Sequence, residues 1–167
     1  MMRQIVLWNG CWVFEFYDRH GRLRRRLPFP NGLTTVGGNY LADTGFRGTA
    51  QSSTWYVGLI SATSFTALAV ADTMAAHTGW TESQAYSEAV RQTWSADAAS
   101  GGIITNSTKA VFSMNADATI RGAFLTSSNT KGGTTCTLFC TGQADTDQVM
   151  SSGESLKVVY TGELVSG

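Results

Sequence analysis

Histidine and cysteine are the first residue types to consider for catalysis or metal binding, and the chain has two of the former and three of the latter. His20 falls in an apparent hairpin turn, and His77 follows a short stretch with helix-capping signals, so neither is placed beside a nucleophile. Cys136 and Cys140 lie on one face of an apparent strand, but about 13 Å apart, which is too far for a disulfide. We expect His77 to cap or pack, and Cys11, like the other two thiols, to be a small buried group.

The motifs of common catalytic sites are missing from the sequence. No GxSxG, HExxH or phosphate-binding GK[ST] pattern occurs, and Gly132 and Gly133 after Lys131 are typical of a flexible turn. Asp145 and Asp147 could share a cation, but paired carboxylates in a loop are more often simply solvated. We therefore predict that the protein is not an enzyme and uses no cofactor and no metal ion.

Arginine is concentrated near the start of the chain. Residues 1–30 hold six arginines against two carboxylates, so this segment carries +4 and the remaining residues −4, because the whole chain is neutral. Arg22, Arg24 and Arg26 alternate along one side of an expected strand and could dock on an acidic surface of another copy or another protein. A solvated hairpin is the alternative. Direct DNA binding is not expected, because the chain is neutral and aliphatic residues interrupt the arginine run.

Five tryptophans and five tyrosines could form a platform for stacking sugars, as in carbohydrate-binding β-sandwich modules. However, Trp55, Trp80 and Trp94 lie in apolar-patterned or helix-flanking contexts that are more typical of a core. We expect these three to be mainly core residues.

The composition favours a mainly β domain. Charged residues make up only 14% of the 167 residues and are replaced by Ser, Thr and Gly, which suit strands and turns. No apolar run approaches the roughly 18 residues of a membrane span, and residues 5–8 are too short for the core of a signal peptide. We therefore expect a single domain that is made in the cytoplasm and is not a membrane protein.

Residues 1–30 have the pattern of a β-hairpin arm. Residues 11–17 (CWVFEFY) alternate, residues 18–21 (DRHG) have turn chemistry, and residues 22–27 form the return strand. Asn9 and Gly10 could turn a shorter strand before it. Pro28 and Pro30 flank Phe29, and because proline has no N–H to donate, we place the boundary between this arm and the rest of the chain at this point.

Residues 31–53 are rich in Gly, Thr and Asn and predict an extended connector, with a short helix ending near Gly45. Residues 54–167 predict the body, a β-sandwich or jelly roll, because short alternating segments recur between turn clusters. A helix of one or two turns is expected at residues 73–77, with Asp72 as its N-cap and Gly79 beyond its end. Residues 81–93 are compatible with either helix or strand. These are the segments we expect to be strands: residues 54–60, 109–115, 119–126, 134–141 and 156–164.

A series of phrases along the chain resembles a family of small virion-associated structural proteins of tailed bacteriophages. The phrases are FEFYDRHGRL, NYLADTGFRGTA, WYVGLI, ADTMAAHTGWTE, AYSEAVRQTW, NSTKAVFSMN, GAFLTSSNTKGGTTCTLF and SGESLKVVYT, spread from residue 14 to residue 161. None of them carries a catalytic residue. The resemblance implies a component of the virus particle.

Within that family resemblance, a capsid cement or decoration protein fits the sequence best. Such subunits combine a compact β body with an arm that crosses a joint between capsomers, and weak contacts add up over many copies. The expected partners are the major capsid protein and other copies of the chain, as a symmetric trimer or a dimer. The contacts would come from six side chains of the arm: Arg22, Arg24, Arg26, Phe14, Phe16 and Phe29.

Two other functions remain open. A tail or fibre component that recognises host surface glycans would expose aromatic residues in its C-terminal loops. An enzyme of the particle that degrades the host wall is disfavoured by the missing acid and base residues.

Overall fold

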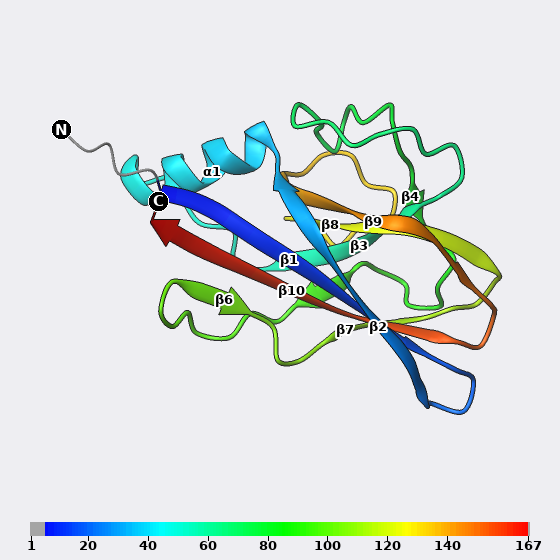
Figure 1. Cartoon of the computed structure of the whole chain (residues 1–167). Helices are drawn as coiled ribbons and strands as arrows, with labels where there is room; N and C mark the ends of the chain where they lie inside the picture. The colour runs from blue at the N-terminus through cyan, green and yellow to red at the C-terminus, as the bar shows by residue number, and fades with distance from the viewer. Residues whose placement is uncertain (1–5, 167) are drawn as a thin grey trace.

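The computed structural model describes residues 6–166 and confirms the mainly β class (Figure 1). Within this range there are ten strands and one helix. In chain order the elements are β1 (Val6–Tyr17), β2 (Leu23–Leu33), α1 (Thr35–Phe46), β3 (Trp55–Ser61), β4 (Glu82–Ser83), β5 (Gln92–Trp94), β6 (Ile103–Thr105), β7 (Ala110–Ser113), β8 (Ala118–Thr126), β9 (Leu138–Met150) and β10 (Ser155–Ser166).

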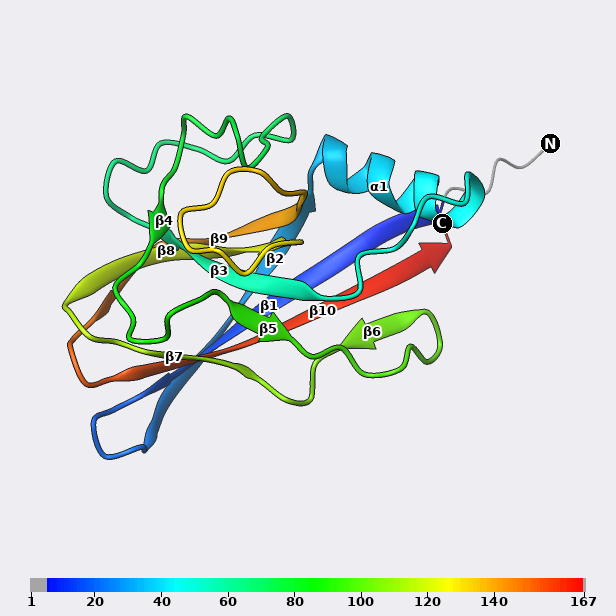
Figure 2. The same ribbon diagram turned by 180° about the vertical axis from the view of Figure 1, so that it is seen from behind.

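All the strand pairs are antiparallel and belong to one sheet with the order β4-β3-β8-β9-β2-β1-β10-β6. Two short strands lie off this path, because β5 pairs with β3 and β7 pairs with β10. The sheet curls, so that β2, β1, β10, β6 and β7 form one layer and β3, β4, β5, β8 and β9 face them as a second (Figures 1 and 2). The result is a sandwich whose two layers are joined where β2 pairs with β9.

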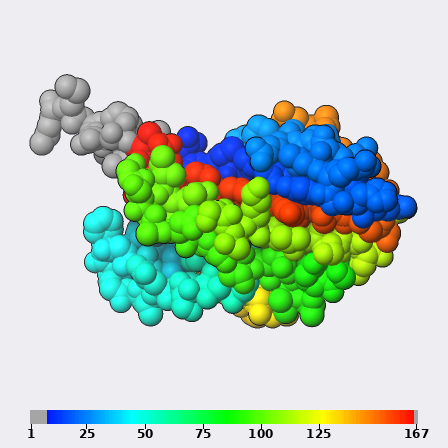
Figure 3. All heavy atoms as spheres, turned by 90° about the horizontal axis from the view of Figure 1, so that it is seen from below, coloured from blue at the N-terminus to red at the C-terminus, as the bar shows by residue number. Residues whose placement is uncertain are grey.

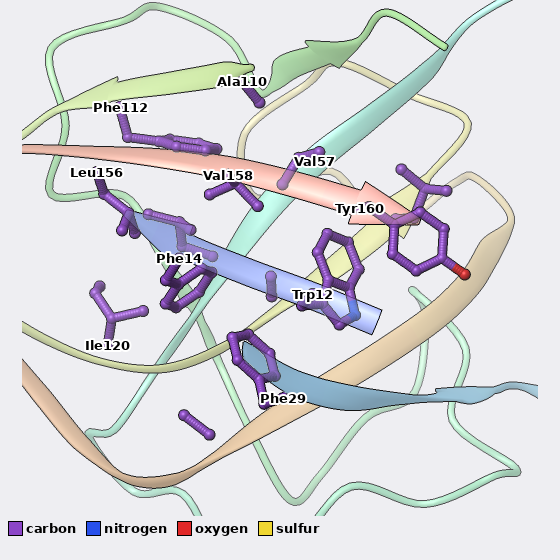
Figure 4. Packing of buried hydrophobic residues seen from close by; sticks show 14 of the residues in the cluster. Trp12, Phe14, Phe29, Val57, Ala110, Phe112, Ile120, Leu156, Val158 and Tyr160 are labelled. Atoms are coloured by element: carbon purple, nitrogen blue, oxygen red, sulfur yellow. The ribbon is translucent and has the colours of Figure 1, made fainter. Parts of the chain in front are cut away.

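The main core fills the space between the two layers (Figure 4). Trp12 and Phe14 point inward from β1 because alternate residues of a strand face the same side. The Phe14 and Phe29 rings meet edge to face with centroids 4.7 Å apart, and Trp12 packs on Tyr160 at 4.4 Å. Burial of such rings is the main stabilising contribution of this layer contact.

A second, smaller core lies on the outer face of β3 and β8, where the segment 62–81 covers Ile60 and Phe124. The segment is held by Trp80, whose ring N–H donates to the Asp72 carboxylate over 3.0 Å. The same carboxylate accepts from the backbone N–H of Ala69. The predicted helix at residues 73–77 is therefore wrong: Asp72 binds the tryptophan and the preceding turn, and Thr73 pairs with Ala76 in a tight turn.

The predicted division of the chain at the prolines does not agree with the structure. β1 is a central strand that pairs with β10 over its whole length and with β2 on its other side, so the described part of the predicted arm, residues 6–30, is not separate from the body. β2 continues through Pro28 and Pro30 to Leu33, and it tolerates them because β9 pairs only with residues 31–33. The expected turn at Asn9 and Gly10 is also absent, since both residues pair with β10.

Residues 31–53 are not an extended connector, because they contain the end of β2 and α1. The Thr34 side chain caps the helix by accepting from the Gly37 backbone N–H over 3.0 Å. The short helix expected near Gly45 is confirmed and ends at Phe46. Residues 82–83 and 92–94 are short strands, which answers the question left open for residues 81–93. Within the described range, no helix has the length and apolar character needed to cross a membrane.

A buried ion pair fixes the loop between β8 and β9. Arg91 is fully buried, and its guanidinium donates to both carboxylate oxygens of Glu82 over 2.9 and 2.8 Å. Arg91 also donates to the backbone carbonyls of Ser128 and Gly133, while the Gly132 backbone N–H donates to Glu82. The pair therefore hydrogen-bonds the segment that contains Glu82 and Arg91 to the backbone of the β8–β9 loop.

Candidate binding site

The hairpin end, residues 18–26, consists of the turn after β1 and the first residues of β2. It carries the three arginines that the sequence singled out, and all three are exposed. Each is nevertheless partnered in an ion pair within the chain. The distances are 2.8 Å for Arg22–Asp18, 2.9 Å for Arg24–Glu154 and 2.9 Å for Arg26–Glu15. Exposed pairs of this kind contribute little to stability, and the arginines can still meet another anion.

The turn of the hairpin end is held by Asp18. Its carboxylate accepts hydrogen bonds from the backbone N–H groups of Arg22 and His20 and from the Arg22 guanidinium. The backbone bond from Arg22 is the main reason that the pKa of Asp18 falls to about 2. Gly21 takes a positive φ of 74°, which closes the turn as its position predicts.

Arg26 belongs to a charged cluster on the outer face of the sheet. Glu15 is buried there under Lys109, which lies 2.8 Å away, and under Arg26, and it accepts from the Tyr17 hydroxyl. Burial would raise the pKa of Glu15, but the hydrogen bonds from Lys109 and Tyr17 and the two positive charges more than offset it, so the pKa is lowered. Because Arg26 neutralises Glu15, it is less available to a partner.

Two further arginines complete the positive charge of the hairpin end. Within the described residues, Arg19 and Arg25 form no ion pair. Arg25 lies over the Phe16 ring at 4.2 Å, and Arg19 borders an open recess shared with Arg22 and Arg24. The recess and its neighbour therefore hold four arginines against Asp18 and Glu154, a surplus of positive charge. Arg19 and Arg25 were missed as site residues because ion pairing cannot be read from the arginine run.

The three phenylalanines predicted as partner anchors are core residues instead. Phe14, Phe16 and Phe29 are buried between the two layers, with no more than 5% of each exposed. The prediction is wrong because the three rings lie on the faces of β1 and β2 that point into the sandwich. The second layer of the sheet covers these faces.

A second candidate site, the aromatic cleft, lies beside α1, at the other end of the sandwich from the hairpin end (Figure 3). Its volume is about 240 Å³. In Figure 3 the surface is recessed between α1 with the following segment, in cyan, and the segment that contains β6, in green. The cleft is lined by Trp8, Tyr40, Leu41, Thr44, Gln51, Ser52, Trp55, Trp94, Ile104, Leu125 and Phe139.

The rings of the cleft hold one another in place. Tyr40 meets Trp55 edge to face at 5.0 Å, and Trp55 packs on Phe139 at 5.3 Å. Trp8 approaches Phe139 edge to face at 5.6 Å, while its N–H donates to the Tyr160 hydroxyl. The walls are therefore fixed before any partner arrives, which lowers the entropy cost of binding.

Few polar groups of the cleft are available to a ligand. The Thr44 hydroxyl donates to the Tyr40 carbonyl, and the Ser52 hydroxyl donates to the Thr54 carbonyl. The Tyr40 hydroxyl accepts from the Ser52 backbone N–H. Within the described chain, the Gln51 amide makes no hydrogen bond. A lining of rings with so little free hydrogen-bonding capacity suits an apolar side chain better than a sugar, which needs several convergent polar groups.

The sequence did not indicate this cleft. Trp8 and Tyr40 were not singled out, and Trp55 was expected in the core but is half-buried in the cleft wall. Trp80 and Trp94 are core residues as predicted. Their apolar contexts were informative, but the meeting of residues from β1, α1, β3 and β9 depends on the tertiary fold.

The remaining reactive side chains are dispersed. His20 is exposed in the turn, and His77 stacks on Trp80 at a centroid distance of 3.9 Å, as expected for a packing residue. Cys140 is buried, which raises its pKa to about 12. Cys11 is exposed and Cys136 is half-buried, so the expectation of a buried thiol is wrong for Cys11 and holds fully only for Cys140. Among residues 6–166 no three His, Cys, Asp or Glu side chains are grouped as metal ligands.

No protein-family model matches the chain, and no curated protein matches it.

Proposed function

We propose that the chain is a non-catalytic structural subunit of a tailed-phage virion, which decorates the head by binding the major capsid protein. The hairpin end is the surface that makes this contact. The observation that carries the proposal is its surplus of arginine on a projecting turn that Asp18 fixes by hydrogen bonds, at the end of the molecule opposite to α1 (Figure 1). An acidic patch on the shell would be its complement.

The local order of the hairpin end supports a docking role. Asp18 fixes the turn through three hydrogen bonds, and Arg24 is anchored to Glu154 in the turn between β9 and β10. Arginines that are already positioned lose little side-chain entropy when they meet a carboxylate. Each contact is weak, but when several subunits are linked and bind a capsid lattice together, the overall affinity exceeds that of a single contact.

The resemblance of the chain to small virion-associated proteins supports a role in the particle, and the place on the outer surface of the head is part of the proposal. With Phe14, Phe16 and Phe29 inside the core, the proposed contact is mainly electrostatic. It should therefore weaken as salt rises, since the screening length falls from about 10 Å at 0.1 M to about 3 Å at 1 M.

The test is co-sedimentation of the purified protein with expanded capsids that lack it. We expect saturable binding at many copies per shell and greater resistance of the shell to heat. A variant with Arg19→Ala, Arg22→Ala and Arg24→Ala should bind more weakly, with most of the difference at low salt. The matched control is Arg47→Ala, which removes an exposed, ion-paired arginine that directly follows α1, outside the hairpin end.

Absence of binding by the wild-type protein would refute the decoration role. A tail location, with glycans of the host surface as the ligand, would then be tested by binding to host cells. Equal binding by the arginine variant and the wild type at low salt would refute the hairpin end as the docking surface.

A further inference from the structure

The layer that contains β1, β2 and β10 carries an apolar strip on its outer face. This outer strip consists of five outward-facing residues that are neighbours in the strand register: Cys11, Val13, Pro28, Pro30 and Val159. They face outward because the residues next to them in the strands, Trp12, Phe29 and Val158, point into the core. All five are exposed or half-buried, so the described chain leaves the outer strip open to solvent.

An apolar strip is uncommon on this kind of surface. The solvent face of an antiparallel sheet normally carries polar residues, while the apolar residues alternate with them on the inner face. The helix and the long loop do not cover it, because α1 packs on β9 and the segment 62–81 covers β3 and β8. Exposed apolar surface with a polar rim is typical of an interaction site.

A row of charged side chains borders the outer strip toward the hairpin end. Glu15 is buried in this row, with Arg26 beside it on β2 and Lys157 beside it on β10. The Lys109 amine lies 2.8 Å from the Glu15 carboxylate, so three positive charges surround one negative charge and the row keeps a surplus of +2. At the opposite end of the outer strip, the outward-facing Glu163 of β10 is negative. The face is therefore polarised, with its positive side toward the hairpin end.

The outer strip and the charged row are too small to form an interface alone. Strands lie about 4.8 Å apart and rise about 3.4 Å per residue, so the two together measure roughly 15 Å by 20 Å. This is about 300 Å², whereas each partner of a standard interface contributes about 800 Å². A partner that covers the outer strip must therefore cover neighbouring surface as well. The hairpin end adjoins it, because Arg26 belongs to both the hairpin end and the charged row.

We propose that the docking surface continues from the hairpin end across the outer strip. The partner that fits it is an apolar patch of the major capsid protein, bordered by carboxylates on the side that meets the hairpin end. The identity of this partner rests on the proposed function. The carboxylates meet the surplus of positive charge and set the orientation of the subunit, while the apolar contact adds affinity that salt does not screen.

The first test is alkylation of Cys11 by N-ethylmaleimide in the free protein and in the protein bound to expanded capsids. Cys11 is exposed in the outer strip, so its labelling should be lost on binding. Mass spectrometry of the peptides separates Cys11 from the half-buried Cys136. Prior alkylation should also weaken binding of the wild type, whereas treated and untreated Cys11→Ser should bind alike.

The second test is a double variant, Val13→Thr with Val159→Thr, which keeps the β-branched shape and replaces one methyl group of each side chain by a hydroxyl. The dissociation constant from capsids should rise about 5- to 10-fold, and the rise should persist at about 1 M salt, where the arginine contacts are screened. The matched control is Val90→Thr, which changes an exposed valine between β4 and β5 and should leave binding unchanged. Circular dichroism and thermal unfolding should show that the variants fold.

The outcomes separate this inference from the decoration role. If the wild type co-sediments with capsids while Cys11 reacts as fast as in the free protein, the outer strip is not part of the interface and the decoration role stands. Equal binding by the double variant and the wild type would lead to the same conclusion. If the wild type does not bind capsids at all, this inference and the proposed function both fall.

Discussion

Replacing Arg91 by alanine should be among the most damaging single changes in the protein. The guanidinium is fully buried and makes two charge-assisted hydrogen bonds to Glu82, and further bonds to the Ser128 and Gly133 carbonyls. Arg91→Ala leaves the Glu82 carboxylate buried without its counter-charge and leaves both carbonyls without their donor. Breaking a buried pair in this way costs about 3–5 kcal/mol.

The expected loss can be converted into a melting temperature. For a domain of 150–250 residues, 1 kcal/mol corresponds to about 2–4 °C, so Arg91→Ala should lower the Tm by roughly 6–20 °C. The free energy of unfolding is best measured by urea denaturation, because the slope reports whether unfolding remains two-state. Arg47→Ala, which breaks an exposed pair on α1, is the control and should cost less than about 1 kcal/mol.

A double variant separates the penalty of an unpaired charge from general loss of packing. Arg91→Met with Glu82→Gln removes both charges and keeps most of the side-chain volume. It should therefore be more stable than Arg91→Ala, because no unpaired charge is buried. If Arg91→Ala cost no more than Arg47→Ala, or if the double variant were less stable than Arg91→Ala, this account of the buried pair would be refuted.

Two further predictions concern acid stability and helix packing. The folded protein lowers the pKa of Glu15 from its ordinary 4.5, so the stability from its pairs is present above that pH and is lost as the pH falls through the folded value. The Tm of Glu15→Gln should therefore fall less between about pH 7 and about pH 3 than that of the wild type, and equal acid sensitivity would contradict this. A Cβ at Gly37 would lie 2.0 Å from the Phe139 carbonyl oxygen, whereas one at Gly38 would meet only a Leu33 methyl at 3.6 Å. Gly37→Ala should therefore lower the Tm, and Gly38→Ala should be neutral or stabilise by about 0.5–1 kcal/mol; the reverse order in thermal unfolding would contradict the packing of α1 on β9.

The strands of the chain were largely predictable from local patterns. The alternation in residues 11–17, the turn chemistry of residues 18–21 and the regular recurrence of strands after residue 54 all appear in the structure. These features depend on the two-residue period of a strand and on the preferences of Asp and Gly for turns, which act within a few residues.

Some local signals were overridden by contacts with distant residues. Asp72 has the position of a helix N-cap, but its carboxylate binds the Trp80 ring N–H, and no helix forms after it. Pro28 and Pro30 indicated a boundary, but β2 continues through them. Both prolines pair with β1, and they precede the part of β2 that pairs with β9. In both cases the decisive partner comes from another part of the chain.

The sequence by itself determined the β class, the hairpin turn at residues 18–21 and which side chains share a face of each strand. Only the tertiary structure decided that Phe14 and Phe29 face this chain's own core, and that Trp8, Tyr40 and Trp55 meet in one cleft. The physical reason is that alternation fixes which residues lie on the same face, whereas the strand order decides what covers that face. That order is set by long-range pairing, as between β1 and β10, which lie about as far apart in the sequence as two strands can.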